Sequence, residues 1–510
     1  MLPGTRLGLL FAVIGLTSTW LVFPLVAGSL ALLRDFWSWA VLCLVALWCS
    51  QQSKPRVRLE QSLAYSLLLA AWINAAQGLA QAYELWRHVG TGDVNGFLHQ
   101  RNQFATLSLL GLAASAWILE RHGNSGRHGR AWRTTVLIGA LALGGVLSLS
   151  ASRTGLLGLA LLWLASECLG RGGAAGHSAP HNLRTALRWA MVGYGLALLP
   201  SLQVSLQGGL PSLGILARQT AQEGVQVCAS RLSLWSNVIE LIGQRPWTGW
   251  GWGELDYAHF VTPFHSTRFC ELLSNAHNLP LHLAVELGLP ATLLACAVAA
   301  WCIVRARPWN ERHPTRLMAW SLLLAIGVHS MLEYPWWYGP FQVCALGAVW
   351  LLWRTRPSNE RVGRSGPTPE LRRTSVQVGM TALLGLVLLV AADYYRASQI
   401  YLPATQRLGA YRTATQAQIR SSVWFQDLID FADLGLMEVT PDNAAQVHGL
   451  ALKMLHFSPE AAVVEKLLDS AYLLGLLQEY EHYQQRFSAA YPQAFLAWKA
   501  RQTAPNPPKK

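Results

Sequence analysis

The chain has 510 residues, of which 52% are hydrophobic and only 13% are charged, and its formal net charge is +13. The apolar residues form long runs instead of the amphipathic patterns of a soluble protein, so the composition indicates a membrane protein. The basic residues concentrate in the loops between these runs and no nucleic-acid-binding motif accompanies them, so the charge gives no support for a nucleic-acid partner.

Apolar segments recur from the N-terminus to residue 392 and predict an all-α polytopic membrane protein. A hydrocarbon core about 30 Å thick needs about 20 helical residues per crossing, so we expect about eleven transmembrane helices, in a range of about 10 to 13. The predicted spans are 7–33, 36–50, 62–80, 103–119, 134–150, 154–169, 186–204, 278–304, 317–333, 338–353 and 376–392. The first is long and contains Pro24, which favours a kink or a re-entrant piece. We see no cleavage site that would mark it as a removed signal peptide.

The Lys and Arg residues of the short loops fall into two unequal sets. One set of loops, which includes the N-terminus, carries 21 of them. The opposite loops carry four: Arg34, Arg87, Arg101 and Arg153. Because positive residues stay on the cytoplasmic side, the N-terminus is expected in the cytoplasm and the region after residue 392 on the outer face of the membrane.

Two regions do not read as membrane spans. One is a long external loop, and loops of that length are usually functional. The other is a C-terminal region in which 444–455 and 461–477 show helical periodicity after Pro-containing turns, which predicts paired short helices resembling tetratricopeptide-type hairpins. We find no second copy at a fixed period. The expected parts are 1–204 (transmembrane), 205–277 (external loop), 278–392 (transmembrane) and 393–510 (external helical domain).

Two of the eight cysteines, Cys228 and Cys270, fall in the external loop, whereas the other six fall in predicted spans. An oxidising compartment would let these two form a disulfide. Two unrelated thiols are the alternative.

Three arginines lie at the predicted outer edge of the membrane: Arg101 in "HQRNQFAT", Arg153 in "SLSASRTGLLG" and Arg231 in "ASRLSLW". An arginine at this boundary needs an anion, and the phosphate of a bulk lipid headgroup satisfies any one of them. Three together beside a long loop favour a lipid-linked diphosphate, because the planar guanidinium makes bidentate, charge-assisted hydrogen bonds.

His277 ends the external loop, and Asn278 and Glu286 follow it at the start of a predicted span. Imidazole is a suitable general base for a hydroxyl group, although a histidine at a helix terminus also serves simply as a cap. Three other histidines compete with it for this role: His259, His265 and His282. No spacing predicts a catalytic metal site, and no glycine-rich loop predicts a nucleotide cofactor.

The runs "RLSLWSNVIELIGQRPWTGWGWGEL" and "AHNLPLHLAVELGLPATLL" resemble the O-antigen ligase and protein O-oligosaccharyltransferase superfamily of bacterial membrane proteins. These runs follow the pattern of that superfamily: an Arg, a Trp, a Pro-x-x-Gly-x-Gly turn, and then the motifs His-Asn-x-x-Leu and Glu-x-Gly-x-Pro. "QRNQFAT" and "LEYPWWYGPFQ" resemble the pilin-glycosylating branch more than the lipopolysaccharide ligases. The resemblance covers about residues 95 to 345.

This resemblance implies a metal-independent, inverting glycosyltransferase of the bacterial inner membrane without a cofactor. It would transfer a glycan en bloc from undecaprenyl diphosphate to a Ser or Thr hydroxyl of an exported protein such as pilin, on the periplasmic side. The implied base is His277, and the implied diphosphate-binding residues are Arg153 and Arg231, supported by Arg101. The further supporting residues are Glu286, Asn278, Glu333 and Tyr334.

Two alternatives remain at this point. An O-antigen ligase or polymerase would use lipid A-core or the glycan itself as acceptor, although the C-terminal region and "LEYPWWY" argue against it. A transporter of a lipid-linked glycan would carry ionisable residues near mid-bilayer and internal repeats. His329 lies well inside a predicted span, but we find no convincing repeat.

Overall fold

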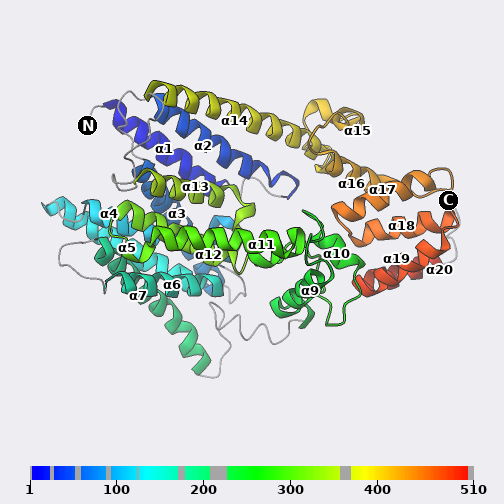
Figure 1. Ribbon diagram of the computed structural model, residues 1–510, viewed down its shortest axis with the longest axis horizontal. Helices are drawn as coiled ribbons and strands as arrows, with labels where there is room; N and C mark the ends of the chain where they lie inside the picture. The colour runs from blue at the N-terminus through cyan, green and yellow to red at the C-terminus, as the bar shows by residue number, and fades with distance from the viewer. Residues whose placement is uncertain are drawn as a thin grey trace. The chain divides into compact units, whose positions relative to one another are not determined.

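The computed structural model describes residues 3–22, 28–51, 59–87, 94–122, 126–170, 179–206, 227–355 and 369–503. These residues form α-helices and short 3₁₀ turns, and no strand occurs among them. The chain divides into two compact units (Figure 1). The first unit comprises residues 1–224 and 302–391, and the second comprises residues 225–301 and 392–510.

Every predicted span coincides with a helix for at least part of its length. In the first unit these helices are α1 (Pro3–Leu21), α2 (Leu33–Gln51), α3 (Leu59–Arg87), α4 (Arg101–His122), α5 (Gly126–Leu149), α6 (Arg153–Gly170), α7 (Ala179–Leu206), α12 (Pro314–Ser330), α13 (Gly339–Arg354) and most of α14 (Pro369–Ala397). The first predicted span begins as α1 but this helix ends at Leu21, and Pro24 lies outside the described residues. The predicted span 317–333 ends as a helix at Ser330, three residues early.

Six helices among the described residues are long and apolar enough to cross a membrane. They are Leu33–Gln51, Leu59–Arg87, Arg101–His122, Arg127–Leu149, Leu279–Asn310 and Arg373–Tyr401. The protein is therefore an α-helical polytopic membrane protein. The total of about eleven spans and the side of the membrane on which each loop lies stay predictions.

Helix α4 is the centre of the first unit, because 94% of its apolar window is buried. It packs against α3, α5, α6, α7 and α12. Small residues let helices in this unit approach closely, as is common between membrane helices. A Cβ atom at Gly144 of α5 would lie 1.8 Å from the carbonyl oxygen of Ala190, and one at Gly193 of α7 would lie 1.9 Å from that of Leu141.

The second unit is built from α9 (Arg231–Gln244), α10 (Leu255–Val261), most of α11 (Leu279–Ala306), α15 (Thr415–Ile419), α16 (Gln426–Leu436), α17 (Ala444–Phe457), α18 (Ala461–Leu473), α19 (Leu477–Ala490) and α20 (Pro492–Thr503). Neighbouring helices from α16 to α20 pack on one another (Figure 1). Helices α17 and α18 correspond to the predicted pair of short helices.

Helix α10 joins the segment before α11 to the C-terminal helices within this unit. Phe260 is buried in the core of the C-terminal helices, with its ring 6.5 Å from that of Tyr483. Tyr257 stacks on His456 at 3.9 Å, and His456 contacts Glu254 at 2.7 Å. Through α10, the segment before α11 therefore contributes to the hydrophobic core of the C-terminal helices, from which the sequence presents it as separate.

Candidate active site

A turn after α9 docks onto a break in α11 and fixes the region around the predicted base. Helix α11 is interrupted at Gly288, whose φ of 83° and ψ of 165° are not helical. Pro290 has no N–H group, so the helix cannot satisfy the carbonyl of Glu286 in the usual way. Instead Gly251 N–H donates to that carbonyl at 3.0 Å, and Trp250 N–H donates to the carbonyl of Val285 at 2.8 Å.

A third hydrogen bond runs the other way, from Leu289 N–H to the carbonyl of Pro246 at 2.7 Å. Glycine is required on both sides of this contact. A Cβ atom at Gly249 would lie 2.3 Å from the carbonyl oxygen of Glu286, and one at Gly288 would lie 2.4 Å from that of Trp247. The Pro-x-x-Gly-x-Gly and Glu-x-Gly-x-Pro motifs are thus the two halves of one tertiary contact.

His277 lies just before α11 in a left-handed backbone conformation, with φ of 51°. Such a conformation is uncommon for a residue other than glycine and persists only where neighbours hold it. The His277 N–H donates to Asn275 Oδ1 at 2.8 Å, and the Trp235 indole donates to the carbonyl of Ala276 at 3.0 Å. Two side chains therefore hold the peptide group that leads into His277, whose side chain is half-buried.

The first turns of α11 carry the supporting residues. Asn278 caps the helix, since its Oδ1 accepts from Leu281 N–H at 3.0 Å. Glu286 is buried, its carboxylate is hydrogen-bonded by the backbone of Gly253, and His282 Nε2 lies 3.6 Å from its Oε1. The docked turn therefore holds the Glu286 side chain as well as its backbone.

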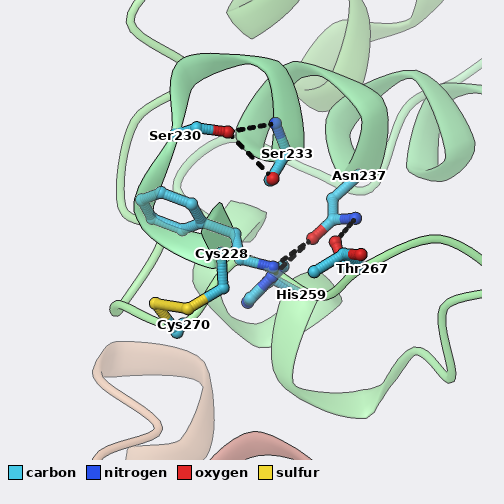
Figure 2. The surroundings of a disulfide bond; sticks show 8 residues. Cys228, Ser230, Ser233, Asn237, His259, Thr267 and Cys270 are labelled. Carbon is cyan, nitrogen blue, oxygen red and sulfur yellow. Dashed lines mark hydrogen bonds between the residues drawn. A yellow bond between two sulfur atoms is a disulfide. The ribbon is translucent and has the colours of Figure 1, made fainter. Parts of the chain in front are cut away.

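Arg231 is the first residue of α9 and is exposed. Ser230 caps this helix by accepting from Ser233 N–H at 3.1 Å. Just before the cap, the structure joins Cys228 to Cys270 as a disulfide, with their Cα atoms 5.4 Å apart (Figure 2). The disulfide thus ties the start of α9 to the segment that leads into His277.

His259, one of the competing histidines, is a core residue. Its Nε2 lies 3.3 Å from Asn237 Oδ1, as Figure 2 shows, and its ring packs on Phe264 at 5.0 Å. Burial, with the charge of Arg268 as a second cause, lowers the pKa of His259 to about 3. Asn237 also accepts from Phe269 N–H at 2.7 Å and is fully buried. His259 is therefore neutral and structural.

His265, a second competitor, is exposed and lies 2.8 Å from Glu240 at the surface of the same unit. Near α10, burial raises the pKa of Asp256 to about 6. Asp256 lies in α10, close enough to Glu286 for the two carboxyl groups to interact electrostatically.

In the first unit a chain of buried hydrogen bonds connects the starts of α4 and α6. Ser152 Oγ donates to Asn102 Oδ1 at 2.7 Å, and Asn102 Nδ2 donates to Glu333 Oε1 at 2.9 Å. Ser152 also caps α6 by accepting from Gly155 N–H at 2.9 Å. Arg101 directly precedes Asn102, and Arg153 directly follows Ser152.

The structure therefore groups the predicted residues by unit. In the first unit, Glu333 belongs to the hydrogen-bonded chain, Arg101 and Arg153 directly neighbour its other two members, and Tyr334 follows Glu333. Arg231, His277, Asn278 and Glu286 belong to the second unit. Sequence reasoning missed the polar residues that bond to or beside them: Asn102, Ser152, Trp235 and Asn275. For Asn102 and Ser152, the signal in the sequence was a polar residue directly beside a predicted arginine.

All three arginines begin helices, which is the wrong end for a cation in a helix macrodipole. An anion at these positions would be stabilised by the arginine and by the N-terminal N–H groups together. Within the ranges that the structure describes, no group of three or more His, Cys, Asp or Glu side chains is placed to hold a metal ion.

Fold and site together define a polytopic α-helical membrane protein that places arginines and a held histidine at the beginnings of helices. The O-antigen ligase family matches residues 138–296, and the C-terminal family of virulence factor membrane-bound polymerases matches residues 317–504. The chain belongs to the superfamily of O-antigen ligases and O-oligosaccharyltransferases.

Two curated relatives come from Acinetobacter baylyi. The chain is 25% identical over 375 residues to a general O-oligosaccharyltransferase, covering 70% of this chain and 61% of that protein. It is 26% identical over 115 residues to a ComP-specific O-oligosaccharyltransferase, covering 22% of this chain and 21% of that protein. The chain thus spans less than two thirds of the length of either relative.

Proposed function

We propose that this protein is an O-oligosaccharyltransferase of the bacterial inner membrane. Its donor is a glycan on undecaprenyl diphosphate, and its acceptor is a Ser or Thr hydroxyl of an exported protein such as pilin, on the periplasmic side. The observation that carries the proposal is the left-handed His277, held by Asn275 just before α11, in a segment that matches the O-antigen ligase family.

In the proposed reaction His277 removes the proton of the acceptor hydroxyl. The hydroxyl oxygen attacks the anomeric carbon, and a carbon–oxygen bond forms as the bond from that carbon to the diphosphate oxygen breaks. Undecaprenyl diphosphate leaves with the electron pair, and the anomeric configuration inverts. No metal or cofactor enters this step.

The arginines act on the leaving group. Arg153 and Arg231, supported by Arg101, bind the donor diphosphate through charge-assisted hydrogen bonds. Negative charge grows on this group as the glycosidic bond breaks, so fixed cations and helix N-termini stabilise the transition state more than the ground state. Glu333 and Asn102 support the first unit's arginines, and Glu286 and Asn278 support His277.

Polymerisation is the second candidate, because residues 317–504 match a polymerase family. The chemistry is the same, but the acceptor is then a sugar hydroxyl of a second lipid-linked glycan. An O-antigen ligase differs again only in its acceptor, lipid A-core. The transporter alternative predicts ionisable residues near mid-bilayer, and His329, which lies inside a predicted span, is buried with its Nδ1 3.0 Å from Thr106 Oγ1.

The test is transfer by the purified protein in detergent, where no gradient exists. The protein is mixed with undecaprenyl-diphosphate-linked glycan and pilin, and the products are analysed by mass spectrometry. We expect pilin to gain the mass of one glycan. Longer lipid-linked glycans without modified pilin would instead show a polymerase. Transfer of the glycan to added lipid A-core would show an O-antigen ligase. Unchanged substrates would contradict glycan transfer altogether.

A further inference from the structure

Helix α9 has apolar residues on two opposite faces. One face, with Leu234, Val238 and Leu241, is buried in the core of the external segment. The other carries Leu232, Ser236, Ile239 and Gly243, and Trp247 follows in the turn; all five are exposed. We call these five residues the outer face of α9.

The large apolar side chains on the outer face of α9 are strongly exposed. Leu232 is 77% exposed, Ile239 59% and Trp247 78%, and a Cβ atom at Gly243 would meet nothing within 4 Å. Large apolar side chains on the exposed face of a helix favour a second apolar partner there. Large exposed apolar residues gathered on one helix face are typical of a protein or membrane interaction site.

The turn places this face beside a membrane-spanning segment. Pro246, next to Trp247, accepts a hydrogen bond from Leu289 N–H of α11 at 2.7 Å. Helix α11 lies in a candidate membrane span whose apolar window is only 11% buried, and Leu293 and Leu294 further along it are 65% and 66% exposed. The backbone at Trp247 is thus held next to a candidate membrane span, while its side chain stays exposed.

The residue types fit the boundary between lipid and water. Trp concentrates at membrane interfaces, and Arg side chains there reach the headgroup phosphates. Arg231 begins the outer face of α9, and Arg245 lies near its other end, with its guanidinium 4.1 Å from the centre of the Trp250 ring. Both arginines are exposed.

We propose that the outer face of α9 is a membrane anchor that rests on the phospholipid surface, with Leu232, Ile239 and Trp247 inserted among the headgroups and upper acyl chains. Amphipathic helices bind at this depth through their apolar face and gain from anionic lipids through their basic residues. The anchor holds whether or not the protein transfers glycans. The anchor sets the depth of Arg231 relative to the membrane, at the level of the lipid phosphates.

The test measures the depth of α9 in the intact protein. The six free cysteines are replaced, the Cys228–Cys270 disulfide is kept, and a nitroxide is attached at Leu232→Cys or Ile239→Cys. The full chain is placed in nanodiscs of phosphatidylethanolamine and phosphatidylglycerol. Collision of the nitroxide with oxygen, which concentrates in lipid, is compared with collision with a water-soluble nickel chelate. Leu496→Cys in α20, where Leu496 is 65% exposed, is the matched control.

We expect the ratio of oxygen to nickel collisions to be several-fold higher at positions 232 and 239 than at position 496. Equal ratios at the three positions would place the outer face of α9 in water and overturn the proposal. Exclusion of both reagents from position 239 would show that protein covers this face, and would overturn it equally. Neither result would bear on glycan transfer, which has its own assay.

Discussion

Substituting Gly288 tests whether the docked turn holds the region of His277. Gly288→Ala puts a side chain on a backbone conformation that is nearly exclusive to glycine, at a cost of about 1–3 kcal/mol. Its Cβ would also lie 2.4 Å from the Trp247 carbonyl oxygen and push the turn away. Losing two of the three hydrogen bonds at the contact adds about 2 kcal/mol.

The expected total is a destabilisation of about 3–5 kcal/mol. For a unit of about 200 residues, this lowers the melting temperature by roughly 6 to 20 °C. Thermal unfolding of the detergent-purified protein measures the change, and glycan transfer should fall with it because the turn also holds Glu286.

The matched control is Gly243→Ala. Gly243 is helical and open space surrounds its Cβ position, so alanine should stabilise α9 by roughly 0.5–1 kcal/mol. The reasoning fails if Gly288→Ala melts at the wild-type temperature, or if both variants lose the same stability.

Three further predictions concern the groups around the site. Cys228→Ser should destabilise the second unit by about 4 kcal/mol in the chain-entropy model, and reductant should lower the melting temperature of the wild type but not of this variant. The pKa of His259 is lowered to about 3 in the folded protein, so as the pH falls the imidazole is protonated in the unfolded chain before it is protonated in the folded one. The free energy of unfolding of the wild type, compared with that of His259→Gln, should therefore fall by about 2 kcal/mol from pH 7 to pH 5. The opposite contribution of Asp256, whose pKa is raised to about 6, is common to both proteins, so an unchanged difference would contradict the assignment. Asn102→Ala should cost about 1–3 kcal/mol and weaken donor binding, since it leaves Glu333 and Ser152 without these bonds; unaltered stability and KM would refute that role.

The sequence predicted the positions of the apolar helices well because the length of an apolar segment is a local property of the chain. Each predicted span coincides with a helix, and the errors lie at the ends, as at Leu21 and Ser330. The apolar pattern does not tell where a helix stops when the next residues are also apolar. The polar "EYP" after Met331 and Leu332 is the first clear signal there.

Contacts between distant segments were beyond the sequence. Phe260 and Tyr257 lie in a short helix without periodicity, so nothing connected them to the C-terminal helices. The pairing of the turn at Gly249 with the break at Gly288 is also non-local. A Gly-x-Pro inside an apolar helix does signal the break, although it does not say which segment fills it.

Charge and chemistry identified the predicted site residues in the sequence. They did not identify the polar residues that form hydrogen bonds around them. Arg101 and Arg153 are conspicuous at the edge of an apolar span, whereas Asn102 and Ser152 beside them look like ordinary polar residues. Their importance comes from a hydrogen bond between two helices 50 residues apart. In the same way, Asn275 matters because it holds the backbone of His277.

The most direct test of the proposed function compares two histidines of the same unit in the glycan-transfer assay. Asn tolerates the left-handed backbone of His277, so His277→Asn removes the base without adding strain, and His265→Asn is the matched exposed control. We expect His277→Asn to lose transfer by at least about a hundredfold with an unchanged melting temperature, and His265→Asn to keep wild-type activity. Near-normal transfer by His277→Asn would contradict the assignment of the base.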